Sequence, residues 1–112
     1  MAEDYALRHL RKSGLALVTR NYHCRFGEID IVMRDAGCLV FVEVRFRSPN
    51  RFATARDSVG TRKQARITTA ATAFLAGHPE FADLPVRFDV VALDGADRDN
   101  WRIEWIRDAF RL

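Results

Sequence analysis

At 112 residues, the chain is long enough for one hydrophobic core and too short for two, so residues 1–112 are predicted to form a single domain. A hydrophobic content of 48% with 29% charged residues is typical of a globular protein and excludes a fibrous or low-complexity chain. No run approaches the roughly 18 apolar residues of a membrane span, and the charged N-terminal segment differs from a signal peptide. We therefore expect a cytoplasmic protein that does not bind membranes.

The cysteines and histidines give no sign of a zinc site or a disulfide framework. Cys24 and Cys38 lie far apart without the spacing of a metal motif, and the three histidines are scattered along the chain.

The net charge of +3 is distributed unevenly. Between residues 45 and 66, seven basic residues accompany a single acid, Asp57. These basic residues are Arg45, Arg47, Arg51, Arg56, Arg62, Lys63 and Arg66. Because arginine pairs with phosphate through a planar fork, the cluster favours a polyanionic partner. A solvated basic loop is the alternative interpretation.

The N-terminal half of the chain is predicted to form a helix and three strands. Apolar residues at helical spacing predict a helix over residues 3–12. A short apolar run over 15–20 predicts the first strand, and the polar residues 21–26 predict a connection. Two longer strands are predicted over 27–32 and 40–47.

The C-terminal half is predicted to form a loop, a helix and two strands. Residues 48–60 lack periodicity and predict a loop, after which Thr61 is expected to cap a helix that ends near Ala76. Strands are predicted over 86–93 and 101–106. This order of elements predicts a three-layer α/β domain, in which helices flank a mixed central β-sheet.

The two longer strands of the first half carry charges inside apolar runs. Side-chain alternation places Glu43 and Arg45 on one face of their strand, and Glu28 and Asp30 together on one face of theirs. The opposite face of the latter strand is expected to hold Ile29, Ile31 and Met33. Since only a short turn separates the strands, a hairpin would bring Asp30 close to Glu43.

Two facing carboxylates beside a cation suggest a metal site. Mg²⁺, or Mn²⁺ in its place, takes hard oxygen ligands and leaves room for water and a substrate phosphate. Arg45 would lie on the face of Glu43, about 6.6 Å further along the strand, where it can stabilise developing negative charge. A surface salt bridge between Glu43 and Arg45 is the competing interpretation.

The two strand motifs resemble a known nuclease signature. Gly27-Glu28-Ile29-Asp30 followed by Phe41-Val42-Glu43-Val44-Arg45 resembles the Asp...Glu-x-Lys pattern of the restriction-endonuclease-like superfamily. More narrowly, the chain resembles the bacterial YraN-type family, which is similar to archaeal Holliday junction resolvases. The resemblance implies a restriction-endonuclease-like fold and Mg²⁺-assisted hydrolysis of structured or branched DNA, with DNA favoured over RNA. A resolvase cuts two strands, so a homodimer would suit this activity.

The resemblance also implies roles for individual residues. Asp30 and Glu43 would be the metal ligands and, together with Arg45, the catalytic residues, while Glu3 matches a first-helix glutamate that reaches the metal. The phosphate backbone would be bound by Arg47, Arg62 and Lys63. Supporting roles would fall to Glu28 and Asp89. For Glu28 the alternative is an ordinary exposed acid, and for Asp89 it is a structural ion pair.

Arg45 departs from the family pattern, which has lysine at this position. Arginine stays protonated and is bulkier, so it is a poor general base. Three interpretations follow. The site needs only a positive charge at this position, or Lys63 supplies the missing amine. In the third, the chain is a non-catalytic nucleic-acid-binding module that keeps the nuclease fold. A further hypothesis is a protein-interaction domain that uses Trp101 and Trp105 on an exposed edge.

Overall fold

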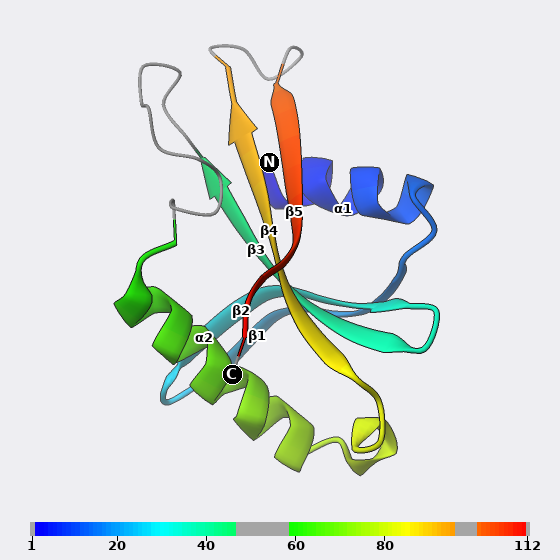
Figure 1. Cartoon of the computed structure of the whole chain (residues 1–112), viewed down its shortest axis with the longest axis vertical. Helices are drawn as coiled ribbons and strands as arrows, with labels where there is room; N and C mark the ends of the chain where they lie inside the picture. The colour runs from blue at the N-terminus through cyan, green and yellow to red at the C-terminus, as the bar shows by residue number, and fades with distance from the viewer. Residues whose placement is uncertain (1, 47–58, 96–100, 112) are drawn as a thin grey trace.

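Two helices cover opposite faces of a mixed β-sheet in the computed structural model, which describes residues 2–46, 59–95 and 101–111 (Figure 1). In chain order, the elements are α1 (Ala2–Lys12), β1 (Ala16–Cys24), β2 (Gly27–Asp35), β3 (Cys38–Phe46), α2 (Thr61–Ala76), the short 3-10 helix η2 (Pro79–Phe81), β4 (Val86–Asp94) and β5 (Arg102–Phe110). The described strands form one sheet in the order β1-β2-β3-β4-β5, in which β3 and β4 run parallel and the other neighbours antiparallel. The predicted three-layer, restriction-endonuclease-like α/β arrangement is confirmed.

Each helix buries an apolar stripe against its own face of the sheet, as the helical spacing of these residues predicts. The stripe of α1 consists of Ala6, Leu7 and Leu10. The stripe of α2 consists of Ile67, Ala70, Ala71 and Phe74. Strand β3 alternates between the two faces as predicted, since Phe41 packs in the cluster under α2 and Val40 and Val42 pack in the cluster under α1. Glu43 therefore belongs to the α2 face.

Strand β1 is longer than predicted. The sequence predicts a polar connection over 21–26, but β1 continues to Cys24 and only Arg25 and Phe26 remain as the turn into β2. The strand continues because Tyr22 pairs with Ile29 and Cys24 with Gly27. Strand β2 provides backbone partners for these residues whatever the polarity of their side chains.

The predicted alternation of β2 is wrong at Ile29. Ile31 and Met33 pack under α1 as expected, but Ile29 packs with Phe74 in the cluster under α2. The change of face falls between the pairs Arg20–Ile31 and Tyr22–Ile29 of the β1–β2 ladder. Asn21 lies there with a φ of 53°, a left-handed conformation that asparagine tolerates better than most residues. Asp30 occupies the same position on β2.

Helix α2 spans the predicted residues, but Thr61 does not cap it. Gly60 is the N-cap and makes no side-chain cap hydrogen bond, while Thr61 is already helical. Because the backbone N–H of Gln64 bonds to the carbonyl of Gly60 at 2.9 Å, the first helical turn closes one residue earlier than the threonine suggests. The first turn contains no acid to balance its cations.

The remaining elements follow the predicted order with different bounds. Strand β5 extends to Phe110, beyond the predicted end at residue 106. Trp101 and Trp105 are half-buried, and their rings pack edge-on against Tyr5 and His9 of α1 at 5.3 and 6.3 Å. Their use as an interaction surface stays a prediction. The predicted loop over 48–60 lies outside the described residues except for its last two. Within the described chain, no helix is both long and apolar enough to cross a membrane.

Candidate active site

Strands β2 and β3 stop pairing where the two predicted metal ligands lie. Their ladder runs from Asp35–Cys38 to Ile31–Val42, and the next residues along are Asp30 and Glu43. In place of a backbone pair, the Asp30 Oδ2 accepts a hydrogen bond from the backbone N–H of Val44 at 2.9 Å. The Asp30 carboxylate is thereby fixed toward β3, next to Glu43.

Glu43 is an acid inside the protein, only 4% exposed. Burial raises its pKa to about 7, and the negative charge of Asp30 adds to this effect, whereas Lys63 and Arg45 oppose it. The Lys63 Nζ lies 3.2 Å from the Glu43 Oε1, and the Arg45 Nη1 lies 3.9 Å from the same oxygen. A divalent cation at this carboxylate would favour its charged form in the same way as Lys63 does.

Glu3, at the start of α1, interacts electrostatically with Asp30, as Glu43 does. Burial raises the pKa of Glu3, and Asp30 raises it further, while Arg20 lowers it. The Arg20 guanidinium lies 3.9 Å from Glu3 and 2.8 Å from Asp4. Glu3 and Arg20 also line an open hollow of about 370 Å³. Glu3 therefore lies within electrostatic range of Asp30, with Arg20 beside it.

Oxygen donors of this kind fit a hard divalent cation. Asp30 and Glu43 supply carboxylates from adjacent strands, and Mg²⁺ commonly binds through one or two carboxylates while keeping several waters. Across residues 2–46, 59–95 and 101–111, no group of three or more His, Cys, Asp or Glu side chains is arranged to hold a metal ion. Metal binding by Asp30, Glu43 and Glu3 therefore stays a prediction.

The two acids predicted to support the site lie in different surroundings. Glu28 is exposed and pairs with the Nδ1 of His23 across the β1–β2 ladder at 3.2 Å. This geometry favours the alternative interpretation of Glu28 as an ordinary surface acid.

Asp89 is fully buried and lies on the other face of the sheet. In the parallel β3–β4 register, Asp89 is beside Val42 and Glu43 is beside Val90, so the two carboxylates point to opposite faces. Asp89 accepts hydrogen bonds from Arg87 Nε at 3.0 Å, Trp105 Nε1 at 2.9 Å and the backbone N–H of Asp108 at 2.9 Å. These contacts favour the structural ion pair over a role beside the metal.

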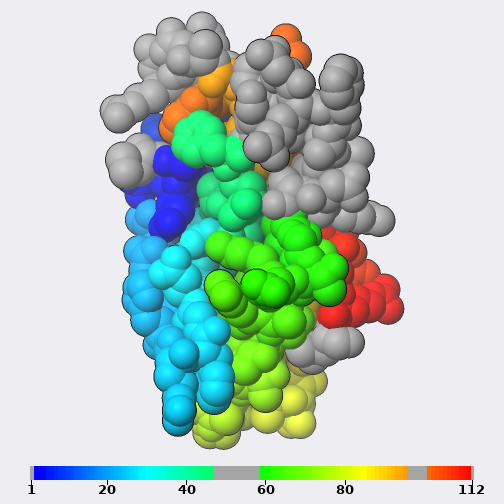
Figure 2. All heavy atoms as spheres, turned by 90° about the vertical axis from the view of Figure 1, so that its left-hand side faces the viewer, coloured from blue at the N-terminus to red at the C-terminus, as the bar shows by residue number. Residues whose placement is uncertain are grey.

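Of the basic residues at the start of α2, Lys63 contacts the carboxylate pair directly. Lys63 is half-buried against Glu43, and Arg62 and Arg66 are exposed. Arg47 lies outside the described residues. Figure 2 looks onto this side of the molecule, where the blue start of α1, the cyan β1–β2 hairpin, the turquoise β3 and the green α2 lie side by side. Phosphate binding by Arg47, Arg62 and Lys63 stays a prediction.

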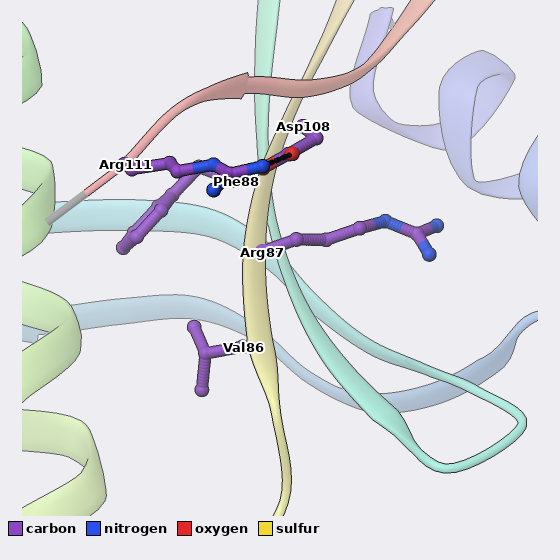
Figure 3. A pocket seen from close by; sticks show the side chains of 5 residues that line it. All are labelled: Val86, Arg87, Phe88, Asp108 and Arg111. Atoms are coloured by element: carbon purple, nitrogen blue, oxygen red, sulfur yellow. Dashed lines mark hydrogen bonds and ion pairs between the residues drawn. The ribbon is translucent and has the colours of Figure 1, made fainter.

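A hollow of about 450 Å³ lies elsewhere, at the start of β4 and the end of β5 (Figure 3). It is lined by Val86, Arg87, Phe88, Asp108 and Arg111. Val86 pairs with Leu39, four residues before Glu43 on β3, so this hollow begins about 13 Å from the carboxylates along the sheet. In Figure 3, Arg87 points away from Val86 and Phe88. The hollow is not part of the carboxylate site.

Sequence reasoning missed two parts of this region. The Val44 N–H that fixes Asp30 could not be foreseen, because every residue except proline has such a group and only the end of the ladder frees it. The Arg25–Phe26 turn was assigned to a polar connection. The signal that could have identified this turn is the sequence Arg25-Phe26-Gly27, in which an aromatic residue lies between an arginine and a glycine.

Comparison with known proteins identifies the family. The family model described as "Uncharacterised protein family UPF0102" matches residues 2–93. The chain belongs to this family. A UPF0102 protein of Ralstonia pickettii is 58% identical over 113 residues, which cover 96% of this chain and 85% of the relative. A UPF0102 protein of Pseudomonas entomophila is 50% identical over 109 residues, which cover 97% of this chain and 89% of that relative. The predicted membership of a largely uncharacterised bacterial family is confirmed.

Proposed function

We propose that the protein is a divalent-metal-dependent nuclease acting on structured or branched DNA. The observation that carries the proposal is the buried Glu43, which lies beside Asp30 where β2 and β3 separate and has the Lys63 Nζ at 3.2 Å.

This arrangement is costly for a structural acid. A carboxyl group whose pKa lies near 7 destabilises the fold at neutral pH, because folding must desolvate its charge or retain its proton. A second acid beside Glu43 increases that cost, and an apolar residue would fill the same space without it. Strongly shifted groups with a specific charged partner are typical of functional sites.

Asp30 and Glu43 would hold Mg²⁺ or Mn²⁺. The ion would polarise the phosphoryl group and lower the pKa of a bound water. The Val44 N–H holds the Asp30 carboxylate in place, so part of the metal site is ordered before the ion binds. Glu3 is the candidate for a further contact from α1.

Lys63 is better placed than Arg45 to supply the amine that the family signature expects. Its Nζ is 3.2 Å from the Glu43 Oε1, compared with 3.9 Å for the Arg45 guanidinium. A lysine can also give up its proton, which arginine does not do in proteins. We assign to Lys63 the orientation of the attacking water, and to Arg45 the stabilisation of charge on the phosphodiester.

The start of α2 provides the surface for the DNA backbone. Arg62 and Lys63 lie in its first turn, which itself contains no acidic residue. Their positive charge and the free N–H groups of this turn both favour a phosphate. Arg47 is assigned to the same role from the sequence alone. A four-way junction has two strands to cut, so we propose that two copies of the chain act together on it.

Cleavage assays test the proposal directly. The purified protein is incubated with Mg²⁺ or Mn²⁺ and with labelled four-way junctions, flaps, single strands, duplexes and an RNA duplex. We expect metal-dependent cleavage of branched DNA that Asp30→Asn and Glu43→Gln abolish. Glu80→Gln makes the same chemical change on the exposed surface of η2 and is the matched control. If the wild type and Glu43→Gln give the same products with every substrate, the protein is not this nuclease.

Arg45 favours a second candidate, a non-catalytic module that binds nucleic acid. Arginine at this position keeps the positive charge of the family lysine but not its titratable amine. This candidate predicts binding that weakens steeply with salt and persists in EDTA, with no cleavage under any condition. Metal-dependent product formation would exclude it.

A further inference from the structure

An aromatic ring is exposed at the turn between β1 and β2. Phe26 is 51% exposed, and among the described residues only Phe46 is another large apolar side chain with comparable exposure. By contrast, Phe41, Phe74 and Phe88 are at most 2% exposed in the core. A single exposed phenylalanine is not unusual by itself, so its neighbours decide what it can bind.

The turn rests on helix α2. A Cβ built on Gly27 would lie 3.5 Å from the Cβ of Arg66, so the backbone next to Phe26 is in close contact with this arginine. Gly27 has a φ of 154°, a conformation that residues with side chains rarely adopt. The position of Phe26 is therefore defined by α2.

The same helix connects the turn to the candidate active site. Lys63 precedes Arg66 by three residues, so the two side chains are neighbours on one face of α2. The Lys63 Nζ reaches Glu43, and the Arg66 backbone reaches Gly27. Helix α2 therefore contacts the turn that carries Phe26 through Arg66, and contacts the carboxylate pair through Lys63, one helical turn away.

Charge around the ring is positive. The Arg25 guanidinium lies over the Phe26 ring, 5.4 Å from its centroid, and Arg62 and Arg66 are exposed on α2. The nearby acid Glu28 is engaged with His23 at 3.2 Å. An exposed ring among arginines is the combination with which proteins bind single-stranded nucleic acid, since bases stack on the ring and phosphates pair with the cations.

We propose that the Arg25–Phe26 turn and Arg66 form a binding site for an unpaired nucleobase and its phosphate. A base stacks on Phe26, and its phosphate lies between Arg25 and Arg66. The site rests on the proposed function, because it would hold an unpaired part of the branched substrate while the phosphodiester lies at Asp30 and Glu43. It thereby defines the substrate class as nucleic acid with unpaired nucleotides next to the cut.

The test measures binding without cleavage. Fluorescence anisotropy in EDTA compares a labelled oligothymidylate, an oligouridylate of the same length and a fully paired DNA duplex. We expect Phe26→Ala to weaken binding of both single strands about tenfold and Phe26→Trp to restore it, because each stacked base contributes at this level. Duplex binding, which depends on phosphate contacts, should change far less.

Phe46→Ala is the matched control, because it removes the other exposed ring, which packs on Trp101 at 4.9 Å and lies on the other face of β3 from Glu43. It should leave single-strand binding unchanged. Thermal melting shows that each variant is folded. The proposal is wrong if wild type and Phe26→Ala bind single strands with equal affinity. It is also wrong if Phe26→Ala loses the same factor in affinity for single strands and for the duplex. A change of oligomeric state in Phe26→Ala would overturn it as well, because the ring would then be a contact between copies.

The two proposals fail separately. If the nuclease proposal is wrong, the protein does not cleave DNA with any metal. The binding assay is unaffected by that result, because it is carried out in EDTA. Conversely, if the wild type cleaves branched DNA in a metal-dependent reaction but Phe26→Ala binds single strands as tightly as the wild type, only the stacking site is refuted.

Discussion

Replacing Glu43 with glutamine is expected to stabilise the protein above neutral pH while it removes metal binding. The wild-type carboxylate is buried beside Asp30, so its charge opposes folding. Glutamine has nearly the same shape and retains an oxygen that can accept a hydrogen bond from Lys63, whose Nζ lies 3.2 Å from the present carboxylate. The substitution therefore removes the charge with little change in packing.

The size and sign of the effect follow from the pKa of Glu43. Its value of about 7 in the folded protein lies above the ordinary value of 4.5. As pH rises, the unfolded chain releases this proton first, so the free energy of unfolding falls between these two values and levels off above pH 7. The gap corresponds to about 3 kcal/mol, which is the largest stabilisation that Glu43→Gln can give. Below pH 4.5 the variant and the wild type should be equally stable.

Urea denaturation followed by circular dichroism measures this difference at pH 4, 6 and 8 in EDTA. Repeating the pH 8 series with 10 mM Mg²⁺ should raise the stability of the wild type but not of Glu43→Gln, because a ligand of the folded state stabilises it by mass action. Glu80→Gln serves as the control, since Glu80 is exposed and its charge is already solvated.

Two results would refute this reasoning. A Glu43→Gln protein that is less stable than wild type at pH 8 would show that the carboxylate stabilises the fold as an ion pair with Lys63. A difference that stays constant from pH 4 to pH 8 would show that packing, and not the titration of Glu43, accounts for the effect.

Three further predictions concern the surroundings of the site. Lys63→Ala should reduce metal-dependent cleavage about 100-fold, the usual effect of losing one stabilising group at a reacting centre, whereas Arg45→Lys should reduce it far less, as gel assays of product formation would show. Asp89→Asn should lower the free energy of unfolding by about 3 kcal/mol in urea titrations, because it breaks a buried network with Arg87, and should leave Mg²⁺ binding intact by calorimetry. Phe74→Ala should cost about 3 to 5 kcal/mol by the same titration, since this ring is 1% exposed at the centre of the α2 cluster.

Each of these predictions has a control or a contrary result. If Lys63→Ala cleaves normally and Arg45→Ala does not, cleavage needs no amine from Lys63 and the arginine suffices. If Asp89→Asn loses Mg²⁺ affinity while it remains folded, Asp89 acts on the site across the sheet. Leu75→Ala, at a half-buried position next to Phe74, should cost clearly less than Phe74→Ala.

Much of the fold could be predicted because its signals are local. Helix α2 was predicted over the residues it occupies, since its apolar stripe repeats at 3.6 residues and Gly77 stops it. The alternation along β3 was predicted correctly because each residue of a regular strand faces the opposite side from its neighbours. The proximity of Asp30 and Glu43 was predicted because a short turn joins their strands.

The errors lie where partners distant in sequence decide the backbone. Strand β1 extends through polar residues because β2 pairs with it, and Ile29 faces α2 because the strand pair changes face at Asn21. Thr61 appeared to be a cap, but closure of the first turn onto Gly60 made it helical. For β1 and for Thr61, hydrogen bonds between backbone groups outweighed the preference of the side chains, and at Ile29 the local backbone conformation did so.

The sequence by itself determined the helices, the regular strands and the choice of Asp30 and Glu43, because periodicity, turn residues and side-chain chemistry are carried by neighbouring residues. Only the tertiary structure decided that Glu43 is buried with a pKa near 7, that Lys63 lies closer to it than Arg45, and that Phe26 lies against α2. Burial, charge interactions and contacts between distant segments arise only when parts of the chain that are far apart in sequence pack together. This packing converts two acids in a hairpin into a candidate active site.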